Sequence, residues 1–266
     1  MRVRRGLAIA FWLFLPLWIL GVANMYRPSV YLEHRYWFTF ESKHFIFHYA
    51  PDYSHRNEIT SYAAIRDTAF ERNCDYLGVT IEDKIDFYVY DDLAGGHAEG
   101  WESMIFADHD QSIGHEMTHV IAYHIAGKRQ KIKLLDEGIA TWLNHAKVEG
   151  GYHGFSQKYY IRKYGLPPLS ELSHTKTFRR HTPPSYYPSA SFVGYLIENY
   201  GMEKFRRLWT ENADYPEVYD LLEQLGFVRF FPFISGQRTH FETTVREIYN
   251  LPLDQLDREW RDWLEE

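Results

Sequence analysis

Cysteine is almost absent from this sequence: Cys74 is the single one among 266 residues. One thiol can form neither an internal disulfide framework nor a metal site built from several cysteines. Its expected role is that of a small buried apolar residue. The chain also has no internal repeat and no low-complexity segment, so a repeat architecture is excluded.

A long basic run is also missing from the body of the chain, and the formal net charge is −7 at pH 7. Nucleic-acid-binding proteins neutralise phosphates with Lys and Arg, so this charge balance argues against a nucleic acid partner. Aromatic residues, in contrast, make up 18% of the chain, with 21 Tyr. They fit either a well-filled core or a groove for extended polymers, and composition does not separate these two. The length allows one large domain or two small ones.

Residues 1–25 have the pattern of a targeting segment. Three arginines, Arg2, Arg4 and Arg5, precede the uncharged apolar stretch Leu7–Ala23. The positive charges should stay in the cytoplasm, which places the rest of the chain on the other side of the membrane. A buried N-terminal helix of a cytosolic protein fits less well, because the stretch lacks an amphipathic face.

Two outcomes for this segment stay open. Gly21, Val22 and Ala23 have roughly the spacing of a signal cleavage site, whereas the Trp and Phe content favours retention as an anchor. We expect an uncleaved signal anchor in the cell membrane, a single-pass N-terminal anchor with the folded domain outside the cytoplasm. Cleavage would leave a secreted or periplasmic protein.

Secondary-structure signals change from strands to helices along the chain. Alternating patterns predict two strands within residues 36–50, and further strands at Ile85–Tyr90 and Ser103–Ala107. Helical spacing predicts a helix at Ile59–Leu77, ended by Gly78. Strands followed by helices indicate the α+β class.

Beyond Gly150 the pattern is mostly helical. The predicted helices are Pro188–Tyr200, Glu203–Trp209, Glu217–Leu225 and Leu253–Glu266. We therefore expect one domain over residues 36–266. Its first part, 36–146, holds the sheet and two further helices around His115 and Glu137, and its second part, 147–266, is a helical half.

His115, Glu116, Met117, Thr118 and His119 form an HExxH motif. Residues four apart in a helix lie on one face, so both imidazoles can reach one metal ion. Glu116 is rotated from that face by about 100°, so it can hydrogen-bond a metal-bound water without ligating the metal. A chance HExxH in a chain of this composition is about a one-in-twenty event, so a second element is needed.

Glu137 supplies that second element, with seventeen residues between it and His119. A catalytic zinc takes three protein ligands and keeps a fourth position for water. The gap is long enough for the first helix to end and for a second to return against it, and the small Ala140 permits close approach. The predicted Zn²⁺ ligands are therefore His115, His119 and Glu137.

HEMTH followed by LDEGIATW resembles the glutamate-zincins, the gluzincin or peptidase MA-like group. The likeness extends to the strand–helix–strand pattern upstream, to the segment YPSASF that leads into a helix, and to the closing helix, so it covers roughly Phe38 to Leu264. The resemblance implies a zincin-like fold with an N-terminal sheet, active-site helices and a C-terminal helical half. It also implies a zinc metallopeptidase acting on a peptide or protein substrate.

The ligand set predicts the mechanism. Two neutral imidazoles and one carboxylate leave a net charge of about +1, which lowers the pKa of a bound water from about 9 towards about 7. Glu116 is the predicted general base, which takes a proton as the water attacks a zinc-polarised carbonyl. Thr141 is either a hydroxyl that hydrogen-bonds a ligand histidine or a helix-face residue bonded to its own backbone.

The resemblance further implies an oxyanion partner, because related gluzincins often use a Tyr or His of the helical half. Tyr187 occupies the matching place in YPSASF and is the predicted catalytic tyrosine, with Tyr186 and His181 as competitors. The other histidines near the motif are not expected to be ligands: His97, His109, His124 and His145. Of these, His124 follows the apolar stripe of the helix and is expected in the core.

Two features concern the substrate. The strand Ser103–Ala107 resembles the edge strand along which zincins bind extended peptides by strand addition. The chain has no G-x-M-E-N segment, with which the aminopeptidase branch captures a free amino terminus, so an endopeptidase is favoured.

Two alternatives stay open. One is a catalytically inactive zinc-binding scaffold that holds a peptide or protein partner in its cleft, and the other is a structural envelope protein without metal. The intact ligand set argues against both, and a scaffold has no chemical need for Glu116.

Overall fold

The computed structural model describes most of the chain after residue 36. The described residues are 37–91, 96–99, 103–108, 113–130, 132–144, 163, 165–180, 185–214 and 236–265. The targeting segment 1–25 and the predicted helix Glu217–Leu225 lie outside them. The predicted boundary between residues 146 and 147 lies outside them as well, so the division into two halves stays a prediction.

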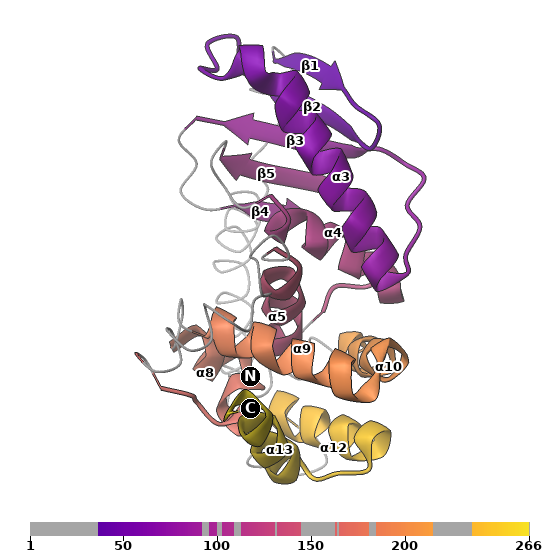
Figure 1. Ribbon diagram of the computed structural model, residues 1–266, viewed down its shortest axis with the longest axis vertical. Coiled ribbons are helices and arrows are strands. Elements are labelled where there is room, and N and C mark those ends of the chain that lie inside the picture. Colours follow the sequence, from indigo (N-terminus) through magenta and orange to yellow (C-terminus); the bar gives the residue numbers. More distant parts are fainter. Residues whose placement is uncertain are drawn as a thin grey trace, which may run out of the picture.

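Five strands form one sheet at one end of the molecule (Figure 1). They are β1 (Phe38–Glu41), β2 (Phe45–Tyr49), β3 (Ile85–Tyr90), β4 (His97–Glu99) and β5 (Met104–Asp108). The order across the sheet is β1-β2-β3-β5-β4, with β2, β3 and β5 parallel and the two outer strands antiparallel to their neighbours. The sequence predicts all of them except β4, because three residues are too few to show an alternating pattern.

The edge of the sheet requires a correction. The strand around Ser103–Ala107 is expected at the edge, but β5 lies between β3 and β4. The chain after β3 first forms β4 and then returns as β5, which pairs parallel with β3 and antiparallel with β4. The edge strand beside the metal motif is therefore β4.

The helix α3 (Ile59–Leu77) follows a short 3₁₀ helix, η1 (Arg56–Glu58), and crosses one face of the sheet (Figure 1). Its bounds are the predicted ones. Gly78 ends it with φ of 55°, a left-handed conformation that glycine adopts without steric cost. The rings of Phe70 and Tyr62 pack edge-on against β2, with centroids 5.4 Å from Phe45 and 5.7 Å from Phe47.

The remaining described elements are helices. They are α4 (His115–Ala126), α5 (Lys133–Asn144), α7 (Leu169–Leu172), α8 (Thr175–Arg180), α9 (Tyr186–Tyr200), α10 (Met202–Ala213), α12 (Gln237–Tyr249) and α13 (Leu253–Glu265). The helices predicted in the C-terminal part correspond to α9, α10 and α13, each beginning within two residues of its predicted start. The α+β class is confirmed, while α7, α8 and α12 were not predicted.

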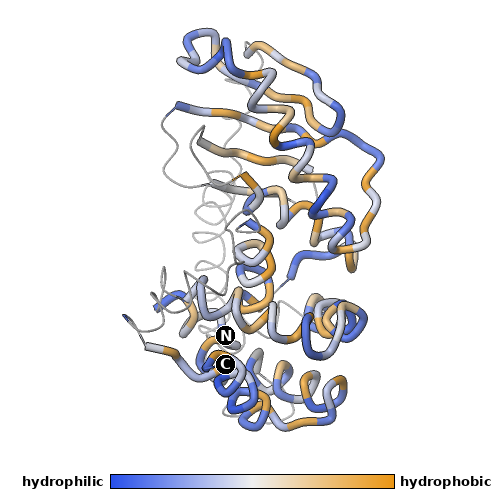
Figure 2. The backbone as a smooth tube through the Cα atoms, viewed as in Figure 1, coloured by the Kyte–Doolittle hydropathy of each residue, from blue (hydrophilic) through white to orange (hydrophobic). Residues whose placement is uncertain are grey.

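The helices continue the molecule away from the sheet. In Figure 1, α4 lies next to β4 and α5 lies beyond it, α9 and α10 come next, and α12 and α13 lie at the opposite end. Hydrophobic positions recur along the central strands, whereas α3 and α13 alternate between hydrophobic and hydrophilic positions (Figure 2). The hydrophobic core extends from the sheet into the helices. It includes Phe45, Phe70, Leu135, Phe192 and Trp260, all at most 2% exposed. The metal motif thus lies at mid-molecule.

The predicted membrane anchor also requires a correction. In the part of the chain that the structure describes, no helix is long and apolar enough to cross a membrane. A span needs about 20 consecutive apolar residues, and α3, with 19 residues, carries Arg66, Asp67 and Glu71 in its middle. This finding is against a single-pass N-terminal anchor. Residues 1–25 themselves lie outside the described part.

Candidate metal centre

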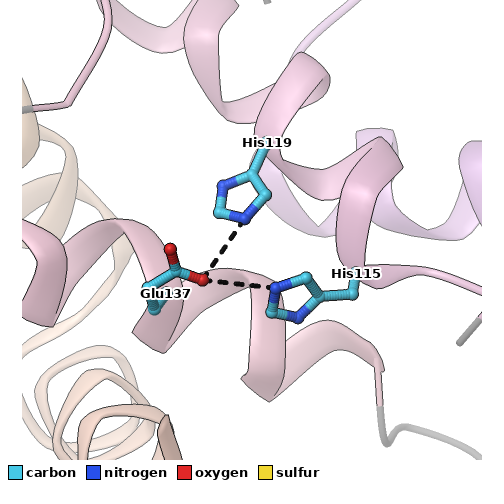
Figure 3. A group of neighbouring side chains, drawn as sticks. All are labelled: His115, His119 and Glu137. Carbon is cyan, nitrogen blue, oxygen red and sulfur yellow. Dashed lines mark hydrogen bonds and ion pairs between the residues drawn. The ribbon is translucent and has the colours of Figure 1, made fainter. Parts of the chain in front are cut away.

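His115, His119 and Glu137 come together between α4 and α5 (Figure 3). One ligand atom from each residue lies within 4.8 Å of the other two. Oε2 of Glu137 is 3.3 Å from Nε2 of His115 and 3.5 Å from Nε2 of His119. The two imidazoles approach the carboxylate from successive turns of α4, as the i, i+4 spacing requires.

These separations fit a tetrahedral metal site. Zinc binds His nitrogen and carboxylate oxygen at about 2.0–2.2 Å, so two ligands at a tetrahedral angle lie about 3.3–3.5 Å apart. The two nitrogens stand at such distances from one oxygen of Glu137. Two imidazoles and one carboxylate are also the donor set of catalytic zinc sites that keep a fourth position open.

Two further residues, Asp136 and Lys133, contact the predicted ligands on the side away from the metal position. Neither was predicted from the sequence. Nδ1 of His119 lies 3.0 Å from Oδ1 of Asp136, which leaves Nε2 free to face the metal position. Nζ of Lys133 donates to Oδ2 of Asp136 at 2.8 Å and to Oε1 of Glu137 at 2.9 Å. Glu137 therefore offers one oxygen to the histidines while the other is held by Lys133.

The charges of this cluster shift its pKa values. Burial acts to raise the pKa of Asp136, but the charges of His119 and Lys133 outweigh it and lower the pKa to about 2. Burial likewise opposes the charged form of His119, yet Asp136 and Glu137 together raise the pKa of the imidazole well above its usual value. The pKa of Glu137 is lowered, against burial, by the two histidines and by Lys133. Both carboxylates are therefore ionised at neutral pH.

A hydrogen-bond network fixes the start of α4. Nδ2 of Asn73, from α3, donates to Oγ1 of Thr118 at 3.0 Å, and Oγ1 donates to the carbonyl of Gly114 at 2.6 Å. The amide of Gly114 donates to Oδ1 of Asn144, at the end of α5, at 3.2 Å. The network ties α3, α4 and α5 together one residue before His115.

The helices α5 and α9 approach each other closely at Gly138, next to Glu137. A Cβ at this position would lie 2.7 Å from the carbonyl oxygen of Ser189 and 2.7 Å from a methyl of Val193. A backbone oxygen cannot move aside like the end of a side chain, so glycine is required here. Ala140, which the sequence predicts to permit a close approach of this helix to α4, is buried at 0% exposure.

A cavity of about 170 Å³ opens at the metal position. Its described lining combines the motif residues His115, Glu116, His119, Asp136 and Glu137 with Gly96, Ala98, Tyr123, Arg129, Gln130, Lys133, Tyr186 and Trp209. Glu116 is 9% exposed, and it follows His115 in the first turn of α4. The cavity thus brings together the predicted base, the predicted ligands and the edge strand β4.

The structure places Tyr186, rather than Tyr187, in this cavity. The ring of Tyr186 lies 6.1 Å from that of His115, and burial together with Glu137 raises the pKa of its hydroxyl. Tyr187 follows it in α9 but is not among the described residues that line the cavity. The third competitor, His181, lies outside the described residues.

Other predicted residues lie elsewhere. Oγ1 of Thr141 is buried and has no hydrogen-bond partner among the described residues, so it does not hold a ligand histidine. His124 is exposed on α4 and not in the core, which corrects its predicted place. Among the described residues, the three predicted ligands are the group found to suit a metal ion, and His124 is not part of it. His109 and His145 lie outside the described residues.

No protein-family model and no curated protein matches the sequence. Solved structures do match. A two-domain M1 zinc metallopeptidase mutant bound to L-arginine aligns with a TM-score of 0.51 and 14% identity, over 84% of this chain and 51% of that chain. The M1 zinc metallopeptidase from Deinococcus radiodurans aligns with a TM-score of 0.50 and 14% identity, over 84% and 50%.

A third structure is a mutant of the Deinococcus radiodurans M1 zinc metallopeptidase bound to the substrate Tyr-Ser-Ala. It aligns with a TM-score of 0.51 and 15% identity, over 84% of this chain and 51% of that chain. The chain therefore has an α+β fold similar to that of M1 zinc metallopeptidases, and it spans about half the length of those chains.

Proposed function

We propose that the chain is a zinc-dependent peptidase whose metal is held by His115, His119 and Glu137. The observation that carries the proposal is the placement of the two Nε2 atoms at 3.3 and 3.5 Å from one oxygen of Glu137, as expected around one tetrahedral zinc. Bound zinc would supply a Lewis acid that polarises a peptide carbonyl and lowers the pKa of water. The fold shared with M1 zinc metallopeptidases supports the same conclusion.

Glu116 is the general base in this proposal. Its carboxylate lines the cavity beside the ligands, while its position one residue after His115 keeps it out of the ligand set. A carboxylate placed there takes a proton from the attacking water and passes it to the leaving nitrogen. A scaffold that only binds a partner has no use for such a group, which favours the enzyme over the scaffold alternative.

Tyr186 is the better donor for the developing oxyanion. It lines the cavity and lies next to His115, and burial keeps its hydroxyl protonated by raising its pKa. A protonated phenol in reach of the reacting carbonyl can donate a hydrogen bond that strengthens as negative charge develops. The role predicted for Tyr187 remains to be tested against this one.

We infer that the substrate is an extended peptide segment. Gly96 and Ala98 bring the edge strand β4 into the lining of the cavity that holds the ligands, where a peptide can add as a further strand. The cavity is smaller than the roughly 300–1,000 Å³ of pockets that enclose a whole small ligand, so it accepts part of a longer chain. One solved neighbour, the mutant named above, binds the tripeptide Tyr-Ser-Ala.

An endopeptidase is favoured over an aminopeptidase. The carboxylates of the described cavity lining are Glu116, Asp136 and Glu137. Asp136 and Glu137 are engaged by Lys133 and the histidines, and Glu116 is the proposed base. None of the three is therefore available to bind a free amino terminus.

The test combines metal content with hydrolysis by the full-length chain. Protein purified without added metal should contain about one zinc per chain by elemental analysis, and Glu137→Ala should lose most of it. The wild-type chain should cleave an unfolded generic protein such as casein, and 1,10-phenanthroline should stop the cleavage.

Glu116→Gln separates the enzyme from the scaffold. It keeps size and hydrogen bonding but cannot accept the proton, so we expect full zinc content and hydrolysis reduced by about 10² or more. Glu203→Gln, the same change on the exposed face of α10, should leave hydrolysis unchanged. A zinc-loaded wild type without any hydrolysis would favour the scaffold.

A further inference from the structure

The loop after α4 presents a cation to the cavity. Arg129 lines the cavity together with the metal-binding residues, and it is exposed. It has no ion-pair or hydrogen-bond partner in the described part of the chain. In contrast, the preceding residue Lys128 is paired with Asp214.

The residues on both sides hold this loop in place. Gln130 is 3% exposed, and its Nε2 donates to the carbonyl of Trp209 at 2.9 Å. Its Oε1 accepts the amide of Ile132 at 3.0 Å. Lys128 binds Asp214 at the end of α10. The guanidinium of Arg129 is thus carried by a loop tethered to α10 on both sides.

Among the described residues of the cavity lining, Arg129 is the cation that remains available. The other described lysine or arginine of the lining is Lys133, which already binds Asp136 and Glu137. The described carboxylates of the lining are all engaged or reserved for the base. Among the described lining residues, the recognition charge left over is therefore positive.

We propose that Arg129 binds a carboxylate of the peptide substrate and thereby sets the specificity of the cleft. This inference rests on the proposed peptidase function. A guanidinium offers two parallel N–H donors to a carboxylate, a geometry that an amide or an apolar end cannot use. The shared chemistry is a carboxylate, which comes either from an Asp or Glu side chain or from the carboxyl terminus of the peptide.

Helix geometry limits where this carboxylate lies. From His119 to Ala126, α4 rises about 10 Å at 1.5 Å per residue. An extended peptide advances about 3.3 Å per residue. Arg129 follows three residues after Ala126 and lines the same cavity as His119, so the carboxylate belongs to a residue a few positions from the cleaved bond. An acidic side chain there keeps the enzyme an endopeptidase, whereas a terminal carboxylate makes it a carboxypeptidase.

The experiment measures binding, so that it does not depend on turnover. The full-length, zinc-loaded Glu116→Gln chain is titrated into two pairs of N-dansylated peptides. The first pair compares Ala-Ala-Phe-Ala-Ala with a free carboxyl terminus and the same peptide with a C-terminal amide. In the second pair, Ala-Ala-Phe-Asp-Ala amide is compared with its Asn analogue. Fluorescence anisotropy gives each Kd.

We expect about tenfold or tighter binding of the acid in at least one pair, since a hydrogen bond to a charged group is typically worth that factor. Arg129→Gln should abolish this preference while leaving the Kd of the uncharged peptide unchanged. Arg129→Lys keeps the positive charge but loses the two parallel N–H donors of the guanidinium, so it should retain part of the preference for the acid. Arg258→Gln is the matched control, the same substitution at an exposed arginine of α13 that is not among the described cavity-lining residues, and it should keep the full preference.

Three results would overturn the proposal: equal Kd values within both pairs, a preference that survives Arg129→Gln, or a preference that falls equally in Arg258→Gln. The pair that shows the preference identifies the source of the carboxylate. Failure of the peptidase proposal would be seen in a different experiment, as the absence of zinc-dependent casein hydrolysis by the wild type. The binding preference is measured independently of that outcome.

Discussion

At the scale of single residues, the metal centre depends on how neighbours orient the ligands. His119 has two ring nitrogens, and only one can face a metal ion. The carboxylate of Asp136 at 3.0 Å from Nδ1 selects Nε2 for that purpose, an arrangement common among metal-binding histidines. Lys133 in turn fixes the carboxylate of Asp136.

Asp136→Asn should therefore weaken zinc binding by about 10–100-fold, the usual cost of losing a group that orients a ligand. The amide keeps the shape but loses the charge that polarises His119 and binds Lys133. Competition with a chromophoric chelator measures the affinity. Asp214→Asn, the same change at an exposed partner of Lys128, is the control and should bind zinc normally. Equal affinity in both variants would remove Asp136 from the site.

The two adjacent tyrosines provide a second test at this scale. Tyr186→Phe removes only the hydroxyl that lines the cavity, and we expect kcat to fall by about 10²–10³ with zinc content unchanged. Tyr187→Phe serves as the matched control and should stay close to wild type. The kinetics of casein-derived peptides distinguish the two. The opposite pattern would restore Tyr187 as the oxyanion donor.

The sequence predicted the group of His115, His119 and Glu137 but not the tyrosine that lines the cavity. Helix geometry explains both outcomes. His115 and His119 lie on one helix, so their relative placement follows from 3.6 residues per turn. Successive residues such as Tyr186 and Tyr187 differ by about 100° of helix rotation. The rotation of α9 about its axis is set by its packing against α5, which local sequence does not reveal.

At the scale of elements, α5 and α9 are brought together by a glycine. Gly138 lies beside Glu137 and faces the backbone of Ser189. The position of Glu137 relative to α4 thus depends on how closely α9 supports α5 from the other side. The packing of these two helices is part of the metal site.

Gly138→Ala should separate the two helices, because its Cβ would lie 2.7 Å from the Ser189 oxygen. Overpacking of this kind typically costs about 1–3 kcal/mol. We expect a lower melting temperature and also weaker zinc binding, since Glu137 moves with its neighbour. Gly165→Ala is the control for backbone strain without a steric clash, because Gly165 has φ of 80° and no atom within 4 Å of an added Cβ. It should lower the melting temperature and leave zinc binding unchanged. Normal zinc affinity in Gly138→Ala would show that α5 holds Glu137 without α9.

Other elements escaped prediction for physical reasons that differ. The strand β4 has three residues and exists because β5 offers it a partner. The helix α12 contains three threonines, which have a low helix propensity. Its buried residues Phe241, Val245 and Ile248 do have helical spacing, and packing against α10 and α13 stabilises it. Tertiary contacts thus determine the secondary structure of segments whose local sequence signals are short or weak.

At the scale of the whole molecule, the sheet and the metal helices share a continuous core. The helix α3 packs on the sheet and also on α4, where Asn73 binds Thr118. Cys74, the next residue along α3, is 8% exposed, and burial raises the pKa of its thiol to about 12. The thiol is therefore neutral and shielded at pH 8, and it becomes reactive only when α3 leaves the core.

Labelling of Cys74 should accordingly report on zinc bound elsewhere in the molecule. Zinc binds the native ligand set, so at about 100 times its Kd it stabilises the folded state by about 2.7 kcal/mol, or about 100-fold in the unfolded population. We expect native protein to react slowly with a maleimide at pH 8, and metal-free protein to react about 100-fold faster. His119→Ala should react at one rate with and without zinc. Rapid labelling of the zinc-loaded protein would contradict the buried thiol. A rate independent of zinc in the wild type would mean that α3 opens without the metal helices.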